Sequence, residues 1–284
     1  MKAAAFDYVK PKALPEALSL LSEAGEDARL IAGGQTLLAT LNMRLSEPSV
    51  LIDITDLAEL EGISVVGDQL RIGALVTHTE IEDSDLIAKH APLLKAAAPH
   101  IAHRAIRNLG TWGGSLAYGD PAAEWPACSL TLNAVMIIYG PAGERRISAQ
   151  DFFIDLYTTS LEPDEILVAT EIPLASKNQV FYFHELARRH GDYAVAGLAA
   201  VANKQGDILS DCAFTFFSVG ATPVMATSAQ NLVNGQKLDP ALIGQAVTAA
   251  RSEVEAIADI TNSAEAKTHL IGVLLERSLK HFIA

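Results

Sequence analysis

Hydrophobic and polar positions follow two patterns in the first part of the chain, one typical of helices and one typical of buried strands. Apolar residues at helical spacing between Pro15 and Leu21 predict a helix that stops near Gly25. The mainly apolar runs 28–32 and 50–54 predict two short buried strands. Residues 1 to about 56 are therefore expected to form a small α/β unit.

The pattern from residue 61 onward changes to paired strands. Alternation across residues 61–76, around a Gly-Asp turn, predicts a hairpin, and so does the stretch 135–147. Residues 81–102 have a helical pattern, and 166–170 indicate one further strand that ends near Pro173. These elements are expected to form a second unit.

A polar linker at residues 175–178 separates this part from the rest of the chain. The runs 180–183, 197–203 and 212–219 predict three strands, the last two joined by a Lys-Gln-Gly-Asp turn. From about residue 240 the spacing of apolar residues predicts helices. The C-terminal part is thus expected to combine a small sheet with helices.

Composition narrows the classes of function. The chain has 284 residues, of which 50% are hydrophobic, which is ample for two domains. A net charge of -13 argues against nucleic-acid binding, which needs a basic surface. Two cysteines, Cys128 and Cys212, cannot ligate an iron–sulfur cluster. We find no signal peptide and no membrane span, so a cytoplasmic location is expected.

Two double-glycine loops carry most of the chemical information. The first is Ala-Gly-Gly-Gln-Thr at 32–36, between a predicted strand and a short helix, and the second is Thr-Trp-Gly-Gly-Ser at 111–115. Glycines allow close approach of the backbone to a ligand, and successive N–H groups form an anion site. The first loop fits neither a Walker A nor a GxGxxG motif. The two loops predict either a cradle for one phosphate-rich ligand or two structural turns.

Three polar clusters offer further candidates. His100 and His103 have the spacing of a metal pair, but no other ligand is near, so a basic helix end is the preferred reading. Asp120 is expected to cap a helix that begins at the following proline, and Glu124 to contact a ligand. Tyr193, in the loop 188–193, either packs on a planar ring or belongs to an ordinary loop.

Three motifs together resemble a known family. They are AGGQTLLATLNMRL at 32–45, IRNLGTWGGSLAYGDPAAEWP at 106–126 and RRHGDYAVAGLAA at 188–200. In this order and spacing they are similar to the FAD-binding medium subunit of molybdenum hydroxylases, the xanthine dehydrogenase and aerobic carbon monoxide dehydrogenase family. The resemblance covers nearly the whole chain.

The resemblance implies an α+β fold. Residues 1–176 would form a two-subdomain FAD-binding domain of the vanillyl-alcohol oxidase (PCMH) type, with subdomains at about 1–56 and 57–176. Residues 177–284 would form a C-terminal domain, a three-stranded antiparallel sheet with a helix bundle.

The resemblance also implies where FAD binds, with its pyrophosphate against the two loops and its isoalloxazine near Ile101, Leu161 and Tyr193. No catalytic or metal-binding residue is expected on this chain. Position 185 departs from the family, since relatives often have a lysine there and this chain has Glu185. The implied FAD-binding residues are Leu30, Ile31, Ala32, Gly33, Gly34, Gln35, Thr36, Leu37, Ile101, Thr111, Gly114, Ser115, Glu124, Leu161 and Tyr193.

The implied function is that of an oxidoreductase subunit. It would accept electrons from a small [2Fe-2S] subunit and pass them to an external acceptor, while a large molybdenum-pterin subunit oxidises the substrate. The expected assembly is a dimer of heterotrimers. Two alternatives stay open at this point: a stand-alone flavin oxidase of the vanillyl-alcohol oxidase type, and a non-catalytic nucleotide-binding assembly subunit.

Overall fold

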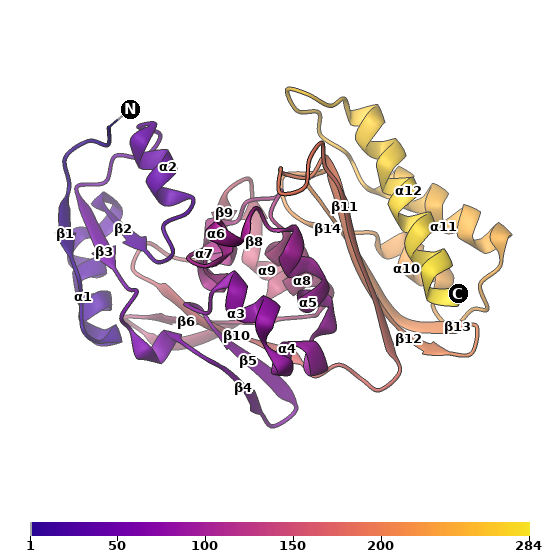
Figure 1. Cartoon of the computed structure of the whole chain (residues 1–284), viewed down its shortest axis with the longest axis horizontal. Coiled ribbons are helices and arrows are strands. Elements are labelled where there is room, and N and C mark those ends of the chain that lie inside the picture. Colours follow the sequence, from indigo (N-terminus) through magenta and orange to yellow (C-terminus); the bar gives the residue numbers. More distant parts are fainter. Residues whose placement is uncertain (1) are drawn as a thin grey trace.

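The computed structural model describes residues 2–284, and its three main sheets follow one another along the chain (Figure 1). The first sheet has the order β1-β3-β2, and both strand pairs are parallel. Parallel strands need crossover connections, and helix α1 connects β1 to β2. The helix buries Ala17 and Leu21. The elements of this N-terminal lobe are β1 (Asp7–Val9), α1 (Leu14–Ala24), η1 (Gly25–Asp27), β2 (Ala28–Ile31), α2 (Leu37–Asn42) and β3 (Val50–Asp53).

The central lobe is built on a five-stranded antiparallel sheet of order β4-β5-β10-β6-β7. Both predicted hairpins are present as its two outer strand pairs, and the predicted strand at 166–170 is its middle strand. Its strands are β4 (Ile63–Val66), β5 (Gln69–Gly73), β6 (Val135–Gly140), β7 (Gly143–Ser148) and β10 (Ile166–Pro173). A two-stranded sheet of β8 (Phe153–Asp155) and β9 (Thr158–Thr159) lies beside it, with η2 (Ala58–Leu60) and α9 (Ala149–Phe152).

Short helices connect β5 to β6, and most of the predicted helical stretch 81–102 is helical, although it is divided into several short helices. Ser84 interrupts it because its hydroxyl accepts a hydrogen bond from Ile87 N and so begins a new helix. Pro92 begins the next one, since proline fits the first turn but not a helix interior. The helices are α3 (His78–Asp83), α4 (Asp85–His90), α5 (Pro92–Ala97), η3 (Ala98–His100), α6 (Arg104–Arg107), α7 (Trp112–Tyr118) and α8 (Glu124–Thr131).

The C-terminal lobe has a four-stranded antiparallel sheet of order β11-β12-β13-β14. The three expected strands form its body, and the two-residue strand β14 extends it at one edge. Three helices cover one face, where Leu198, Phe214, Phe216, Leu274 and Phe282 share a core. The elements are β11 (Gln179–Leu186), β12 (Ala196–Gln205), β13 (Ile208–Phe217), β14 (Val224–Met225), α10 (Thr227–Val233), α11 (Pro240–Glu253) and α12 (Ala264–Ile283).

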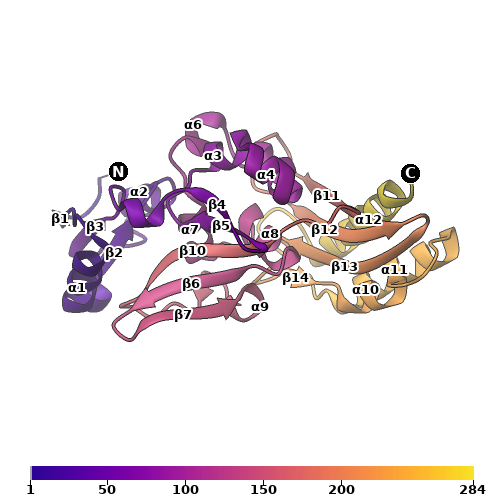
Figure 2. The same cartoon turned by 90° about the horizontal axis from the view of Figure 1, so that it is seen from below.

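The opposite face of the C-terminal sheet packs on the central lobe (Figure 2). Helices α5 and α8 contact this sheet, and Phe183 and Phe217 belong to the same buried cluster as Trp112 and Trp125. The shared core holds α8 and the strand β11 in fixed positions relative to the central sheet. Among the helices within residues 2–284, none combines the length and the apolar character that a membrane span requires.

Candidate functional site

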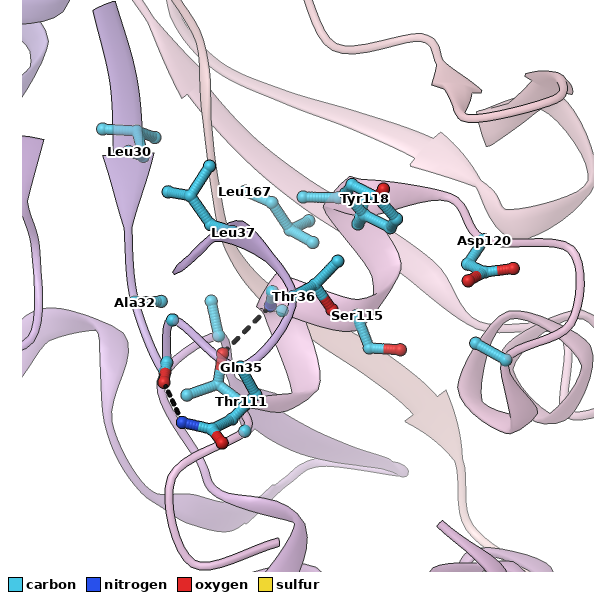
Figure 3. Close-up of a pocket in the computed structure, with 18 of the residues that line it drawn as sticks. Leu30, Ala32, Gln35, Thr36, Leu37, Thr111, Ser115, Tyr118, Asp120 and Leu167 are labelled. Carbon is cyan, nitrogen blue, oxygen red and sulfur yellow. Dashed lines mark hydrogen bonds between the residues drawn. The ribbon is translucent and has the colours of Figure 1, made fainter. Parts of the chain in front are cut away.

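A cavity with a volume of about 900 Å³ is lined by both double-glycine loops (Figure 3). Its walls come from the N-terminal lobe, the central lobe and the loop that ends at Tyr193. Ile31, at the end of β2, is not among the lining residues. All the other proposed binding residues line this cavity: Leu30, Ala32, Gly33, Gly34, Gln35, Thr36, Leu37, Ile101, Thr111, Gly114, Ser115, Glu124, Leu161 and Tyr193.

The first loop offers backbone donors. It connects β2 to α2, as the sequence predicts, and Gly34 adopts a φ of 69°, a conformation that glycine favours. The Gln35 side chain folds back, and its Nε2 donates to Gly33 O at 2.9 Å. Within the described part of the chain, the N–H groups of residues 33–36 donate to no other group. Four consecutive free donors beside a cavity are suited to an anionic ligand.

The second loop differs from the first, because its backbone N–H groups already donate hydrogen bonds within the protein. Gly113 N donates to Ala74 O at 2.8 Å, and Gly114 N donates to Thr111 Oγ1 at 3.1 Å. Ser115 N donates to Thr111 O at 3.1 Å. The loop therefore presents the Ser115 hydroxyl and a small glycine surface to the cavity, rather than the row of free N–H groups that its sequence predicts.

Glycines also bring the two loops together. A Cβ built on Gly33 would lie 2.0 Å from Leu109 O and 2.8 Å from the Gly110 Cα. A Cβ on Gly113 would lie 2.4 Å from the Ala74 Cβ, under the second loop. No real side chain fits at these distances. The glycines at these positions are needed for packing of backbone on backbone, which closes one side of the cavity.

Aromatic side chains form another part of the wall. Tyr118 and Tyr157 lie with ring centroids 5.2 Å apart, and Tyr193 is 68% exposed at the same cavity. The sequence reasoning missed the first two residues. Tyr118 lies within the motif at 106–126 and could have been found there. Tyr157 lies in the β8–β9 hairpin, which no sequence pattern indicated. Exposed rings facing a cavity are suited to covering a planar ligand.

Asp120 does not have the role that its sequence context predicts. Helix α8 begins at Glu124 with Ala123 as its N-cap, so Asp120 does not cap a helix at Pro121. Its carboxylate instead accepts a hydrogen bond from Ala122 N at 2.9 Å, which closes a local turn. Burial raises the pKa of Asp120 above its ordinary value. The turn delays the helix start and places Glu124 at the cavity wall.

Glu124 is the first residue of α8 and lines the cavity. Burial, and after it the neighbouring Glu185, raises the pKa of Glu124 to about 8. Glu185 lies behind it on β11 with a side chain only 5% exposed, and its Oε1 is 3.6 Å from His100 Nδ1. A carboxyl with such a pKa is largely protonated at neutral pH, so it can donate a hydrogen bond.

His78 is a buried cavity residue that sequence reasoning missed. Its Nδ1 accepts a hydrogen bond from Trp125 Nε1 at 2.9 Å, and burial, with the charge of Arg107, lowers its pKa to about 3. The ring is therefore neutral and holds Trp125, and with it α8, in place. No group of three or more His, Cys, Asp or Glu side chains suited to a metal ion is found among residues 2–284.

Two family models together match nearly the whole chain. Residues 4–175 match the family described as the FAD binding domain in molybdopterin dehydrogenase. Residues 181–282 match the CO dehydrogenase flavoprotein C-terminal domain. The nicotine 6-hydroxylase medium subunit of Paenarthrobacter nicotinovorans is 39% identical over 279 residues, which are 98% of each chain.

Two solved structures have closely similar folds. A carbon monoxide dehydrogenase chain from Hydrogenophaga pseudoflava superposes with a TM-score of 0.96 at 34% identity, over 99% of this chain and 98% of that one. A chain of quinoline 2-oxidoreductase from Pseudomonas putida 86 gives a TM-score of 0.94 at 36% identity, over 100% of both chains. The fold class that the three motifs implied is confirmed. The chain belongs to the family of FAD-binding medium subunits of the molybdenum hydroxylases, oxidoreductases that include xanthine dehydrogenase and carbon monoxide dehydrogenase.

Proposed function

We propose that FAD binds in the cavity with its diphosphate over residues 33–36. The observation that carries this proposal is the row of N–H groups in that loop, which have no partner within residues 2–284 and line the cavity. Backbone donors in a concave turn are suited to phosphate oxygens. The hydroxyls of Thr36 and Ser115 lie at the same cavity and would supply further hydrogen bonds.

The isoalloxazine end is proposed to lie against Ile101, Leu161 and Tyr193, which line the cavity beyond the loops. Apolar and aromatic walls are suited to a planar ring system. Glu124, largely protonated at neutral pH, would donate a hydrogen bond to an acceptor atom of the cofactor. Bound FAD supplies the redox chemistry, and these residues bind it, orient it and exclude water.

The proposed role of the chain is to relay electrons from a small iron–sulfur subunit to an external acceptor. A large molybdenum-containing subunit would oxidise the substrate. The names of the relatives, medium subunit and medium chain, support a multi-subunit assembly. We propose a dimer of heterotrimers in the cytoplasm, with the FAD-binding domain at 1–176 and the C-terminal domain at 177–284. Similarity to medium subunits over 98% of the chain favours this role over a stand-alone oxidase or a non-catalytic assembly subunit.

The experiment compares two glycines that both adopt a left-handed backbone conformation. Gly34 has a φ of 69° in the first loop, where a built Cβ would lie 3.2 Å from the end of the Leu38 side chain. Gly67 has a φ of 62° in the β4–β5 turn, where nothing lies within 4 Å of a built Cβ. Gly34→Ala and Gly67→Ala should lower the free energy of unfolding by similar amounts, because a left-handed backbone conformation is unfavourable for alanine at both sites. Only Gly34→Ala should also lower the FAD content of the purified complex. Equal and full FAD content in both variants would overturn the proposed site.

A further inference from the structure

His78 has one ring nitrogen without a partner in the protein. The residue begins helix α3, is only 6% exposed and lines the cavity. Its Nδ1 accepts a hydrogen bond from Trp125 Nε1 at 2.9 Å. No hydrogen bond of its Nε2 is found in the part of the chain that the structure describes. Buried side chains normally have their polar atoms bonded, so a nitrogen left free at a cavity wall is available to a ligand.

The contact with Trp125 fixes which nitrogen of His78 carries the proton. An indole N–H can only donate, so His78 Nδ1 is the acceptor and has no proton. Burial, and after it the charge of Arg107, lowers the pKa of His78 to about 3, so the ring is neutral. A neutral imidazole with an unprotonated Nδ1 has its proton on Nε2. The free nitrogen of His78 is therefore an N–H donor.

The place of this donor is fixed by Gly110. A Cβ built on Gly110 would lie 2.7 Å from His78 Nε2, so this edge of the ring packs against bare backbone. The backbones of the two residues are also joined, since His78 N donates to Gly110 O at 2.9 Å. Thr77 and Thr111, the neighbouring residues, form an isolated β-bridge. The Nε2–H group is thus held beside the start of the second loop.

Gly110 adjoins the first loop as well. A Cβ built on Gly33 would lie 2.8 Å from the Gly110 Cα, so Gly33 and His78 approach the same residue. All three residues line the cavity. The free N–H groups of residues 33–36 and the His78 donor therefore belong to one part of the cavity wall. Donors that converge from two segments are suited to an anion with several oxygens.

We propose that His78 Nε2–H donates a hydrogen bond to a diphosphate oxygen of bound FAD. The inference rests on the proposed position of FAD, with its diphosphate over residues 33–36. The Gly113 and Gly114 amides of the second loop are already bonded within the protein, so His78 supplies a donor beside this loop that its backbone does not. The ring stays neutral throughout and transfers no proton.

Two variants separate this donor from the packing role of the same ring. His78→Asn keeps an acceptor at the Nδ1 position, so the hydrogen bond from Trp125 remains, but no group reaches the Nε2 position. Trp125→Phe removes the same hydrogen bond from the other side and leaves the His78 donor in place, and Trp125 does not line the cavity. The pair therefore exchanges one loss for the other.

The Kd for FAD and the Tm of the full chain, stripped of FAD, are measured for both variants. His78→Asn should raise the Kd about 10- to 100-fold, as expected for a lost hydrogen bond to a charged group, with a Tm near that of the parent. Trp125→Phe should lower the Tm and leave the Kd near that of the parent. An unchanged Kd in His78→Asn would overturn the inference.

ADP identifies the part of FAD that His78 contacts, because it carries the diphosphate without the flavin. In competition with FAD, ADP should bind more weakly to His78→Asn by the same factor as FAD. His78→Gln, whose amide reaches the Nε2 position, should recover part of both affinities. Weaker binding of FAD with unchanged binding of ADP would place the donor at the flavin and overturn the assignment to the diphosphate.

The tautomer has a readout that does not depend on FAD. In the full chain with ¹⁵N-labelled histidine at pH 7, the His78 signals, identified by their loss in His78→Asn, should show a protonated Nε2 and an unprotonated Nδ1. A proton on Nδ1 would overturn the inference. Gly34→Ala keeps this test distinct from that of the FAD site. Full FAD content in Gly34→Ala counts against the proposed site, whereas loss of FAD in that variant with a normal Kd in His78→Asn counts against His78 alone.

Discussion

The carbonyl oxygen of Leu109 occupies the space that a side chain on Gly33 would need, 2.0 Å from a built Cβ. The two residues belong to segments that are far apart in the sequence, and their contact brings the first loop against the segment that leads into the second. The form of the cavity therefore depends on a backbone contact that only glycine permits.

Gly33→Ala should separate the two loops and lower FAD content and stability together. Overpacking of this kind costs about 1–3 kcal/mol. Gly244→Ala on α11 is a suitable control, since nothing lies within 4 Å of its built Cβ and alanine favours a helix interior. Thermal unfolding and the flavin absorbance of the purified complex measure both effects. If Gly33→Ala retains full flavin and an unchanged Tm, the contact does not matter.

Much of this architecture follows from local patterns. The strand runs at 28–31 and 50–53 and both central hairpins are present because alternating or continuous apolar stretches bounded by turn residues leave few alternatives. The predicted helical stretch at 81–102 is present but divided, because new helices begin after Ser84 and at Pro92, and both signals stand in the sequence. The strand β14 has two residues, too few for any periodicity.

The sequence predicted less of the site than of the fold. The glycine motifs located both loops, but only the structure shows that the Gly113 and Gly114 amides are already bonded within the protein. Tyr157 and His78 reach the cavity through tertiary packing, which no local pattern encodes. The relation of Glu185 to His100 joins β11 to η3 and depends on how the two lobes pack.

The separate chain, reconstituted with FAD, should oxidise no organic substrate at a useful rate. The two cysteines are buried, and residues 4–175 match an FAD-binding domain, so the flavin is the redox group that this prediction concerns. A panel of aldehydes and N-heterocycles should therefore leave the flavin oxidised in anaerobic absorbance measurements. Chemically reduced flavin on the same protein should still pass electrons to an artificial acceptor. Rapid bleaching by any one compound would restore the stand-alone oxidase hypothesis.

Lys267→Met should destabilise the C-terminal lobe by about 1.5–3 kcal/mol, the range for hydrogen bonds to charged groups. Lys267 is 5% exposed, and its Nζ donates to Ser218 O at 2.8 Å and lies 2.9 Å from Asp259 Oδ2. Lys280→Met is the control, because Lys280 on the same helix forms only an exposed pair with Glu276. Denaturant unfolding of both variants measures the difference in stability. Equal losses of stability would contradict a stabilising role for the buried contacts of Lys267.

The same ion pair predicts a pH dependence. The hydrogen bond from Lys267 holds the pKa of Asp259 well below its ordinary value of 3.8. A lowered carboxyl pKa stabilises the folded state above that ordinary value and loses this contribution as the pH falls below it. Asp259→Asn should therefore reduce stability at pH 7 and make unfolding less sensitive to acid below about pH 4. A parallel acid titration of both proteins, followed by circular dichroism, checks the sign.

Tyr193→Ala should loosen FAD and expose the flavin to solvent. Tyr193 is 68% exposed at the cavity, so its ring has little protein to pack on and is free to cover a ligand. Stacking of this kind contributes about 0.5–1.5 kcal/mol beyond area burial, so a modest rise in the Kd for FAD is expected. Tyr193→Phe keeps the ring and should bind FAD as the parent does, which separates stacking from any contribution of the hydroxyl. Flavin fluorescence, FAD affinity and the rate of reoxidation by oxygen measure the effect. A plain loop tyrosine would leave all three unchanged in the alanine variant, and that result would remove Tyr193 from the site.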